Sequence, residues 1–235
     1  MKKLEKKELI EMKEITDEEA KIAEALSWFS ENIEFPLLDV WSWVGKISLK
    51  AFPNEKVVHL DRLDFSKEQL ELSSWHSRII DDFFDFNVKN WVIKTVLFCH
   101  SLQYLDDQWI ERVIEKVKNI WPKYVILVIN KNNGVLGKAL KIFKKNNWHE
   151  NWEKYFDSFP WPKFSLIEKK EVTGNFYGKN FTEVCHIISR LLLDTVISET
   201  QEQELIKFLT KSWIKNNFSV DQHIFLYKSN IFKNE

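Results

Sequence analysis

Short apolar runs alternate with amphipathic stretches over the first two thirds of the chain. The runs are typical of buried parallel strands and cover residues 36–40, 57–61, 78–80, 94–99 and 124–129. Apolar residues at helical spacing before and between the runs predict helices over about residues 17–31, 47–52, 66–73, 106–120 and 135–145. Strands that alternate with helices in this way predict βαβ units and a doubly wound, mostly parallel sheet.

The pattern changes after residue 146. An aromatic, irregular segment is followed by a predicted strand, two predicted helices and a final strand, at residues 147–164, 166–176, 180–194, 201–216 and 222–228. The chain is therefore predicted to be an α/β protein with a seven-stranded sheet. We expect an N-terminal helical extension at residues 1–33 and one domain at residues 34–235, in which residues 147–216 form a lid or cap inserted before the last strand.

Charge and composition exclude several classes of function. The 34 Lys and Arg residues nearly balance the 35 Asp and Glu residues, which argues against a nucleic-acid-binding protein that relies on positive charge. No uncharged apolar stretch reaches the about 18 residues of a membrane span, and the first residues lack the apolar core of a signal peptide. Two distant cysteines and the absence of H-E-x-x-H spacing predict no metal site. We expect a cytoplasmic protein.

Acidic residues follow the first three predicted strands. Asp39 and Asp61 end the first two, and Asp81 and Asp82 follow the third. Ligands of open α/β sheets bind outside the carboxyl ends of the strands, where the strand order reverses. A carboxylate such as Asp61, about 20 residues after the first strand, can accept hydrogen bonds from both vicinal hydroxyls of a ribose. The alternative role for such an acid is to cap a turn.

Four segments together resemble the class I S-adenosylmethionine-dependent methyltransferases. They are Leu37-Leu38-Asp39-Val40, Val57-Val58-His59-Leu60-Asp61, Asp81-Asp82-Phe83-Phe84-Asp85 and the run from Val96 to Leu105, VLFCHSLQYL. The resemblance covers roughly residues 20–145 and is strongest for the branch that methylates small molecules. It implies S-adenosylmethionine as the cofactor, bound by a set of residues at the strand ends: Asp39, Trp41, Trp43, Gly45, Asp61, Asp82, Phe83 and Cys99.

The same resemblance places two residues of the fourth strand's loop at the transfer site. His100 is the candidate general base, because an unperturbed histidine titrates near neutral pH. Tyr104 is the second candidate. The ordinary alternatives are a histidine bonded to the backbone at a strand end, a tyrosine packed beneath the site and, for Asp82, the N-cap of a following helix.

The glycine-rich loop of the family is degenerate in this chain. The family's D-x-G-x-G-x-G becomes Asp39-Val40-Trp41-Ser42-Trp43-Val44-Gly45, so that only the last glycine remains. Glycine is scarce overall, with 5 residues where average usage predicts about 16, and tryptophan is abundant, with 11. The missing glycines matter because they let the backbone approach the cofactor closely.

Three interpretations of Trp41 and Trp43 stay open. The loop is displaced and the cofactor still binds, with one indole against the sulfonium through a cation–π contact; or the indoles fill the pocket; or a different ligand uses the cleft. The sequence favours an enzyme that methylates a small molecule or a peptide, and not a nucleic acid. The alternative is a catalytically inactive relative that has lost cofactor binding and serves as a structural or regulatory partner subunit. A protein partner or a homodimer is compatible with both.

Overall fold

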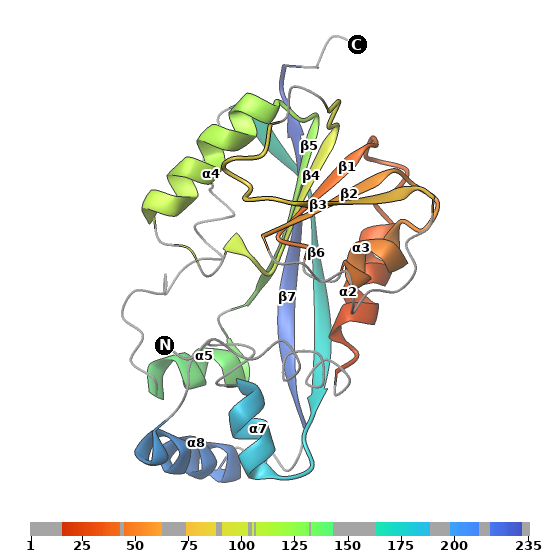
Figure 1. Cartoon of the computed structure of the whole chain (residues 1–235). Helices are drawn as coiled ribbons and strands as arrows, with labels where there is room; N and C mark the ends of the chain where they lie inside the picture. Colours follow the sequence, from red (N-terminus) through yellow and green to blue (C-terminus); the bar gives the residue numbers. More distant parts are fainter. Residues whose placement is uncertain are drawn as a thin grey trace.

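The computed structural model describes residues 16–42, 45–62, 74–87, 91–102, 105, 107–131, 133–142, 163–188, 198–211 and 217–231. A seven-stranded sheet forms the centre of the molecule (Figure 1). Its strands, in chain order, are β1 (Leu37–Val40), β2 (Val57–Asp61), β3 (His76–Ile80), β4 (Thr95–Cys99), β5 (Tyr124–Asn130), β6 (Phe164–Tyr177) and β7 (Asn217–Ser229). No helix within the described ranges is long and apolar enough to span a membrane.

The strand order in the sheet is β3-β2-β1-β4-β5-β7-β6. The first five strands are parallel, and β7 runs antiparallel to both β5 and β6. Chain order therefore reverses at β1, which pairs with β2 on one side and with β4 on the other. The predicted doubly wound, mostly parallel sheet is confirmed. The apolar runs predicted it correctly because β1, β2 and β5 are buried along their whole length.

Two hydrophobic clusters cover the two faces of the sheet. On one face, helices α2 (Glu18–Ser27) and α3 (Lys46–Ala51) pack against strand residues such as Leu97 and Ile126. On the other face, helix α4 (Asp107–Ile120) buries an apolar stripe against Val96 and Phe98. The stripe has the spacing of a helix face and consists of Ile110, Val113, Val117 and Ile120. Figure 1 shows α4 and the α2–α3 pair on opposite sides of the strands.

The last part of the chain extends the sheet beyond the parallel strands. Strands β6 and β7 pair over 13 residue positions, so the segment 147–216 that was predicted as a cap contains the edge strand of the sheet. Helices α7 (Phe181–Ile187) and α8 (Glu199–Lys211) connect these two strands and contact each other. Helix α5 (Gly134–Ile142) packs against α8 and β7. Figure 1 shows α5, α7 and α8 together at the end of the molecule where β5 ends.

Candidate functional site

The carboxyl ends of β1, β2, β3 and β4 lie along one edge of the sheet, because these strands are parallel and adjacent. This edge carries most of the residues that the sequence singles out. Asp39 lies in β1 and Asp61 ends β2, while Asp82 and Phe83 follow β3 and Cys99 ends β4. The strand order reverses at β1, and ligands of open α/β sheets usually bind beside such a reversal. Trp43 and Tyr104 lie outside the described residues.

Trp41 leaves the end of β1 with a φ of 54°, a backbone conformation that normally favours glycine. Its indole packs against three phenylalanine rings. The ring centroids lie 5.4 Å from Phe83, 5.9 Å from Phe98 and 6.1 Å from Phe84. The indole therefore occupies the space between the loop after β1, the turn after β3 and the end of β4.

These rings belong to a larger aromatic cluster, which we define as Trp41, Phe83, Phe84, Phe98 and Trp109. Phe84 contacts Trp109 of α4 with a centroid distance of 5.4 Å. The guanidinium of Arg112 lies 4.5 Å from the Phe84 centroid and 4.3 Å from that of Trp109, within cation–π distance of both. Phe83 is fully buried in the cluster. The cluster fixes Trp41 through packing on several elements.

The carboxylate of Asp39 points beneath α3 into a buried polar network. The hydroxyl of Ser48, on α3, donates a hydrogen bond to Oδ2 of Asp39, and Nδ1 of His59 lies 3.4 Å from the same oxygen. His59 continues the network, with its Nε2 at 2.9 Å from Nδ1 of His76. The Asp39 side chain is thus committed to the interior of the protein.

Histidine 76 ends this network. Its Nε2 lies 3.0 Å from the carbonyl oxygen of Phe52, which can only accept, so Nε2 donates. Neutral His76 then accepts at Nδ1 a hydrogen bond from Nε2 of His59. Burial lowers the pKa of His76, chiefly through desolvation and further through the neighbouring His59. The network therefore favours a neutral imidazole at position 76.

The remaining glycine of the loop, Gly45, lies against this network. It has a φ of +71°, and a Cβ atom built on it would lie 2.6 Å from Nδ1 of His59. The glycine is therefore required by a close approach within the protein. The sequence interpretation assigned Gly45 to the cofactor, and the histidine that explains it was not singled out as a contact.

The carboxylate of Asp82 is hydrogen-bonded within the turn that follows β3. Oδ1 of Asp82 accepts a hydrogen bond from the backbone N–H of Phe84 at 2.9 Å, and Oδ2 lies 3.2 Å from Nε of Arg62. From α4, Nζ of Lys116 donates to the carbonyl oxygens of Phe84 and Phe86, both at 2.8 Å. Asp82 therefore caps the turn after β3, whereas the alternative that the sequence gave for it was the N-cap of a following helix.

His100 lies directly after β4, also at positive φ (54°), and its backbone N–H donates to the carbonyl of Val128 at 2.9 Å. Its side chain extends toward α2, where Nε2 lies 3.7 Å from Oε1 of Glu18. The same Glu18 oxygen accepts a hydrogen bond of 2.5 Å from Nε2 of Gln222 in β7. Sequence reasoning missed Glu18, because nothing local distinguishes it from the other acids of its helix.

Two further residues of the strand ends face the α2 side of the sheet. Cys99 is half-buried and packs against the hydrophobic cluster that contains α2. Asn130, at the end of β5, is buried and lies opposite Gln222 in the β5–β7 register. Within the described ranges, no group of three or more His, Cys, Asp or Glu side chains is arranged to hold a metal ion.

No protein-family model matches the chain, and no curated protein matches it. Solved structures do match it. One is a magnesium protoporphyrin IX methyltransferase from Synechocystis PCC 6803 with bound S-adenosylhomocysteine, at 12% identity and a TM-score of 0.55, covering 90% of this chain and 83% of that one.

Two others are similarly close. The N-methyltransferase NodS from Bradyrhizobium japonicum WM9, in complex with S-adenosylhomocysteine, matches at 10% identity and a TM-score of 0.52, covering 91% and 86% of the two chains. A cyclopropane-fatty-acyl-phospholipid synthase-like protein from Lactobacillus casei ATCC 334 matches at 10% identity and a TM-score of 0.56, covering 89% and 91%. These likenesses show the fold, and the predicted class I methyltransferase fold is confirmed.

Proposed function

We propose that this chain transfers a methyl group from S-adenosylmethionine to a small-molecule or peptide acceptor. The observation that carries the proposal is the position of Asp61 at the carboxyl end of β2, next to the strand at which the sheet order reverses. The fold supports it, since two structural neighbours hold S-adenosylhomocysteine.

The described residues fit the cofactor in part. The carboxylate of Asp61 suits the two hydroxyls of a ribose. When bound, the cofactor supplies an electrophilic methyl group on a sulfonium. The protein's part is then to align the acceptor and to exclude water from the cleft. His100, whose Nε2 lies 3.7 Å from Oε1 of Glu18, is the group that accepts a proton when the acceptor is a hydroxyl or an ammonium.

Trp41 does not fit the usual binding mode and favours a second candidate function. Trp41 stands at the loop position where the family has a glycine that leaves room for the cofactor, and three phenylalanine rings pack against its indole. If the indole fills the cleft, the chain does not bind the cofactor. The second candidate function is therefore that of a catalytically inactive relative, which serves as a structural or regulatory partner subunit. For methyl transfer, the cofactor has to bind beside Trp41, with the indole as part of its wall.

Calorimetric titration with S-adenosylmethionine and S-adenosylhomocysteine distinguishes the two functions. Methyl transfer predicts binding with a dissociation constant at or below about 100 µM. Asp61→Ala should weaken that binding at least about tenfold, because the ribose hydroxyls lose their acceptor. The matched control is Asp85→Ala, which removes the same charge from an exposed position after β3 and should leave the affinity unchanged.

If neither compound gives a heat of binding with the wild-type chain at about 500 µM, the result contradicts methyl transfer. The second function then predicts that Trp41→Gly creates binding, because the glycine leaves the cleft open and tolerates the positive φ. Circular dichroism would confirm that the variant is folded. A folded Trp41→Gly variant that still binds neither compound would contradict the idea that the indole blocks the cleft.

A further inference from the structure

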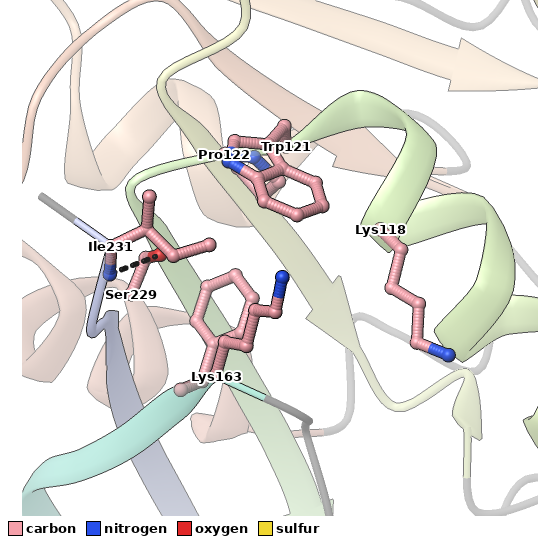
Figure 2. Close-up of a pocket in the computed structure, with 7 residues that line it drawn as sticks. Lys118, Trp121, Pro122, Lys163, Ser229 and Ile231 are labelled. Atoms are coloured by element: carbon pink, nitrogen blue, oxygen red, sulfur yellow. Dashed lines mark hydrogen bonds between the residues drawn. The ribbon is translucent and has the colours of Figure 1, made fainter.

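A cavity lies at the end of the parallel strands opposite the candidate functional site. It has a volume of about 280 Å³ and is bounded by the end of α4, the start of β6 and the end of β7 (Figure 2). Its position before the start of β5 separates it from the candidate functional site, which lies at the carboxyl ends of the strands. It is lined by Lys118, Trp121, Pro122, Lys163, Phe164, Ser229 and Ile231.

The wall of this cavity is largely apolar and open to solvent. Trp121 is 43% exposed and Ile231 is 44% exposed, although both are large apolar side chains. With Pro122 and Phe164 they form a concave apolar surface, and each Å² that a ligand covers contributes about 25 cal/mol. Concave apolar surfaces with a few polar groups are the usual form of small-molecule sites, and the volume suits a small ligand.

One positive charge is held at the cavity. Nζ of Lys163 lies 4.9 Å from the centroid of the Trp121 ring, within cation–π distance of the indole face. Figure 2 shows this ammonium directed toward Trp121. Among the described residues, no carboxylate lies within ion-pair distance of it. Lys118 differs, since its ammonium points away from Trp121 and pairs with Glu115 at 3.1 Å.

The backbone holds the lysine and the indole in place at a cost in strain. Trp121 has a φ of 56° and Lys163 a φ of 74°, left-handed conformations that cost a non-glycine residue about 1–2 kcal/mol each. The only other described non-glycine residues with positive φ, Trp41 and His100, lie at the candidate functional site. The backbone N–H of Asn230 donates to the carbonyl of Lys163 at 2.6 Å and fixes this corner.

We propose that this cavity binds a small carboxylic acid with an apolar body, such as a short fatty acid or an aryl-alkanoic acid. The apolar body packs on Trp121, Phe164 and Ile231, and the carboxylate pairs with the ammonium of Lys163. The hydroxyl of Ser229, which accepts a hydrogen bond from the N–H of Ile231 at 3.4 Å, keeps its own proton to donate to the carboxylate. A single ammonium over an apolar floor suits one negative charge and not a polyphosphate.

The test uses the full chain labelled with 5-fluorotryptophan, and the Trp121 resonance is assigned by its loss in Trp121→Phe. The probes are 4-phenylbutanoate and its neutral analogue 4-phenylbutanamide. The acid should shift the Trp121 resonance with a dissociation constant below about 1 mM, and the amide should bind about tenfold more weakly. Lys163→Met should remove this preference for the acid, whereas Lys118→Met, the matched control, should preserve it.

Three results would overturn the proposal. The first is a Trp121 resonance that does not move with about 5 mM acid. The second is an acid affinity that survives Lys163→Met. The third is an equal loss of affinity for the acid in Lys163→Met and Lys118→Met, which would indicate that overall positive charge attracts the acid. The proposal does not depend on methyl transfer, because the readout is binding at a site remote from the strand ends.

Discussion

Gly45 lies directly against the imidazole of His59. A Cβ atom on Gly45 would lie 2.6 Å from Nδ1 and 2.7 Å from Cε1 of that ring. The ring cannot easily move away, because it is fully buried and hydrogen-bonded to His76. Tryptophan replaces the first two glycines of this loop, at positions 41 and 43. The remaining glycine, Gly45, is needed for the close packing of the loop against His59.

Gly45→Ala should lower the free energy of unfolding by about 2–5 kcal/mol, as the sum of a positive-φ penalty and the overlap with His59. Urea denaturation measures this loss. Gly134→Ala is the matched control, since Gly134 also has a positive φ (+54°) but has no atom within 4 Å of an added Cβ. It should cost only about 1–2 kcal/mol. Equal losses in the two variants would show that the contact with His59 carries no energy.

The hydrogen bond from Ser48 to Asp39 should couple the two side chains strongly, because both are buried. A double-mutant cycle with Ser48→Ala and Asp39→Ala should give a coupling energy of about 1.5–3 kcal/mol, as for other hydrogen bonds to charged groups.

The exposed pair Thr173 and Asp221 provides the control cycle. It joins a hydroxyl to a carboxylate at 2.7 Å. Solvent screens this pair, so its coupling should stay below about 0.5–1 kcal/mol. If the buried pair couples no more strongly than this surface pair, the Asp39 carboxylate is not held in the interior as the structure indicates.

His76 should make the protein less stable in mild acid. Its pKa is lower in the folded chain, mainly through desolvation, than the value of about 6.5 in the unfolded chain. Below pH 6.5 the unfolded chain therefore binds more protons, so this residue's contribution to stability is complete above about pH 6.5 and is lost as the pH falls through the folded pKa. The free energy of unfolding, measured from pH 8 to pH 5, should show this decline.

His76→Gln should flatten that decline, because the titrating imidazole is gone. The control is His186→Gln, which removes an exposed histidine and should leave the slope between pH 6.5 and pH 5 as in the wild type. A slope that persists in the His76 variant would assign the acid sensitivity to other groups.

Lys116 should stabilise the turn after β3. Its ammonium donates to two carbonyl oxygens of that turn, and burial lowers its pKa through desolvation. Lys116→Met should therefore cost about 1–2 kcal/mol. The N–H of Phe86, bonded to the Asp82 carbonyl at 2.8 Å, should exchange its hydrogen faster in this variant. Lys118→Met, on the same helix but half-buried and paired with Glu115, should change stability by less than about 0.5 kcal/mol and leave that exchange rate unchanged.

The sequence by itself determined where the described strands lie along the chain and that most of them are buried parallel strands. Strands β1, β2 and β5 are buried on both faces, so their sequences are nearly continuous apolar runs. The buried residues of α4 recur with the period of a helix. The acids at the strand ends followed from the same pattern, because a parallel strand leaves the core at its carboxyl end. These features are local, and periodicity alone encodes them.

Only the tertiary structure decided where the side chains point. Strand pairing places His59 opposite Asp39, and α3 then brings Ser48 to the same carboxylate. The contact of Glu18 with Gln222 joins residues 204 positions apart. Trp41 meets its phenylalanine partners only because the loop after β1, the turn after β3 and the end of β4 converge at one edge of the sheet. No local pattern records such contacts, because each depends on the register and packing of segments that are distant in the chain.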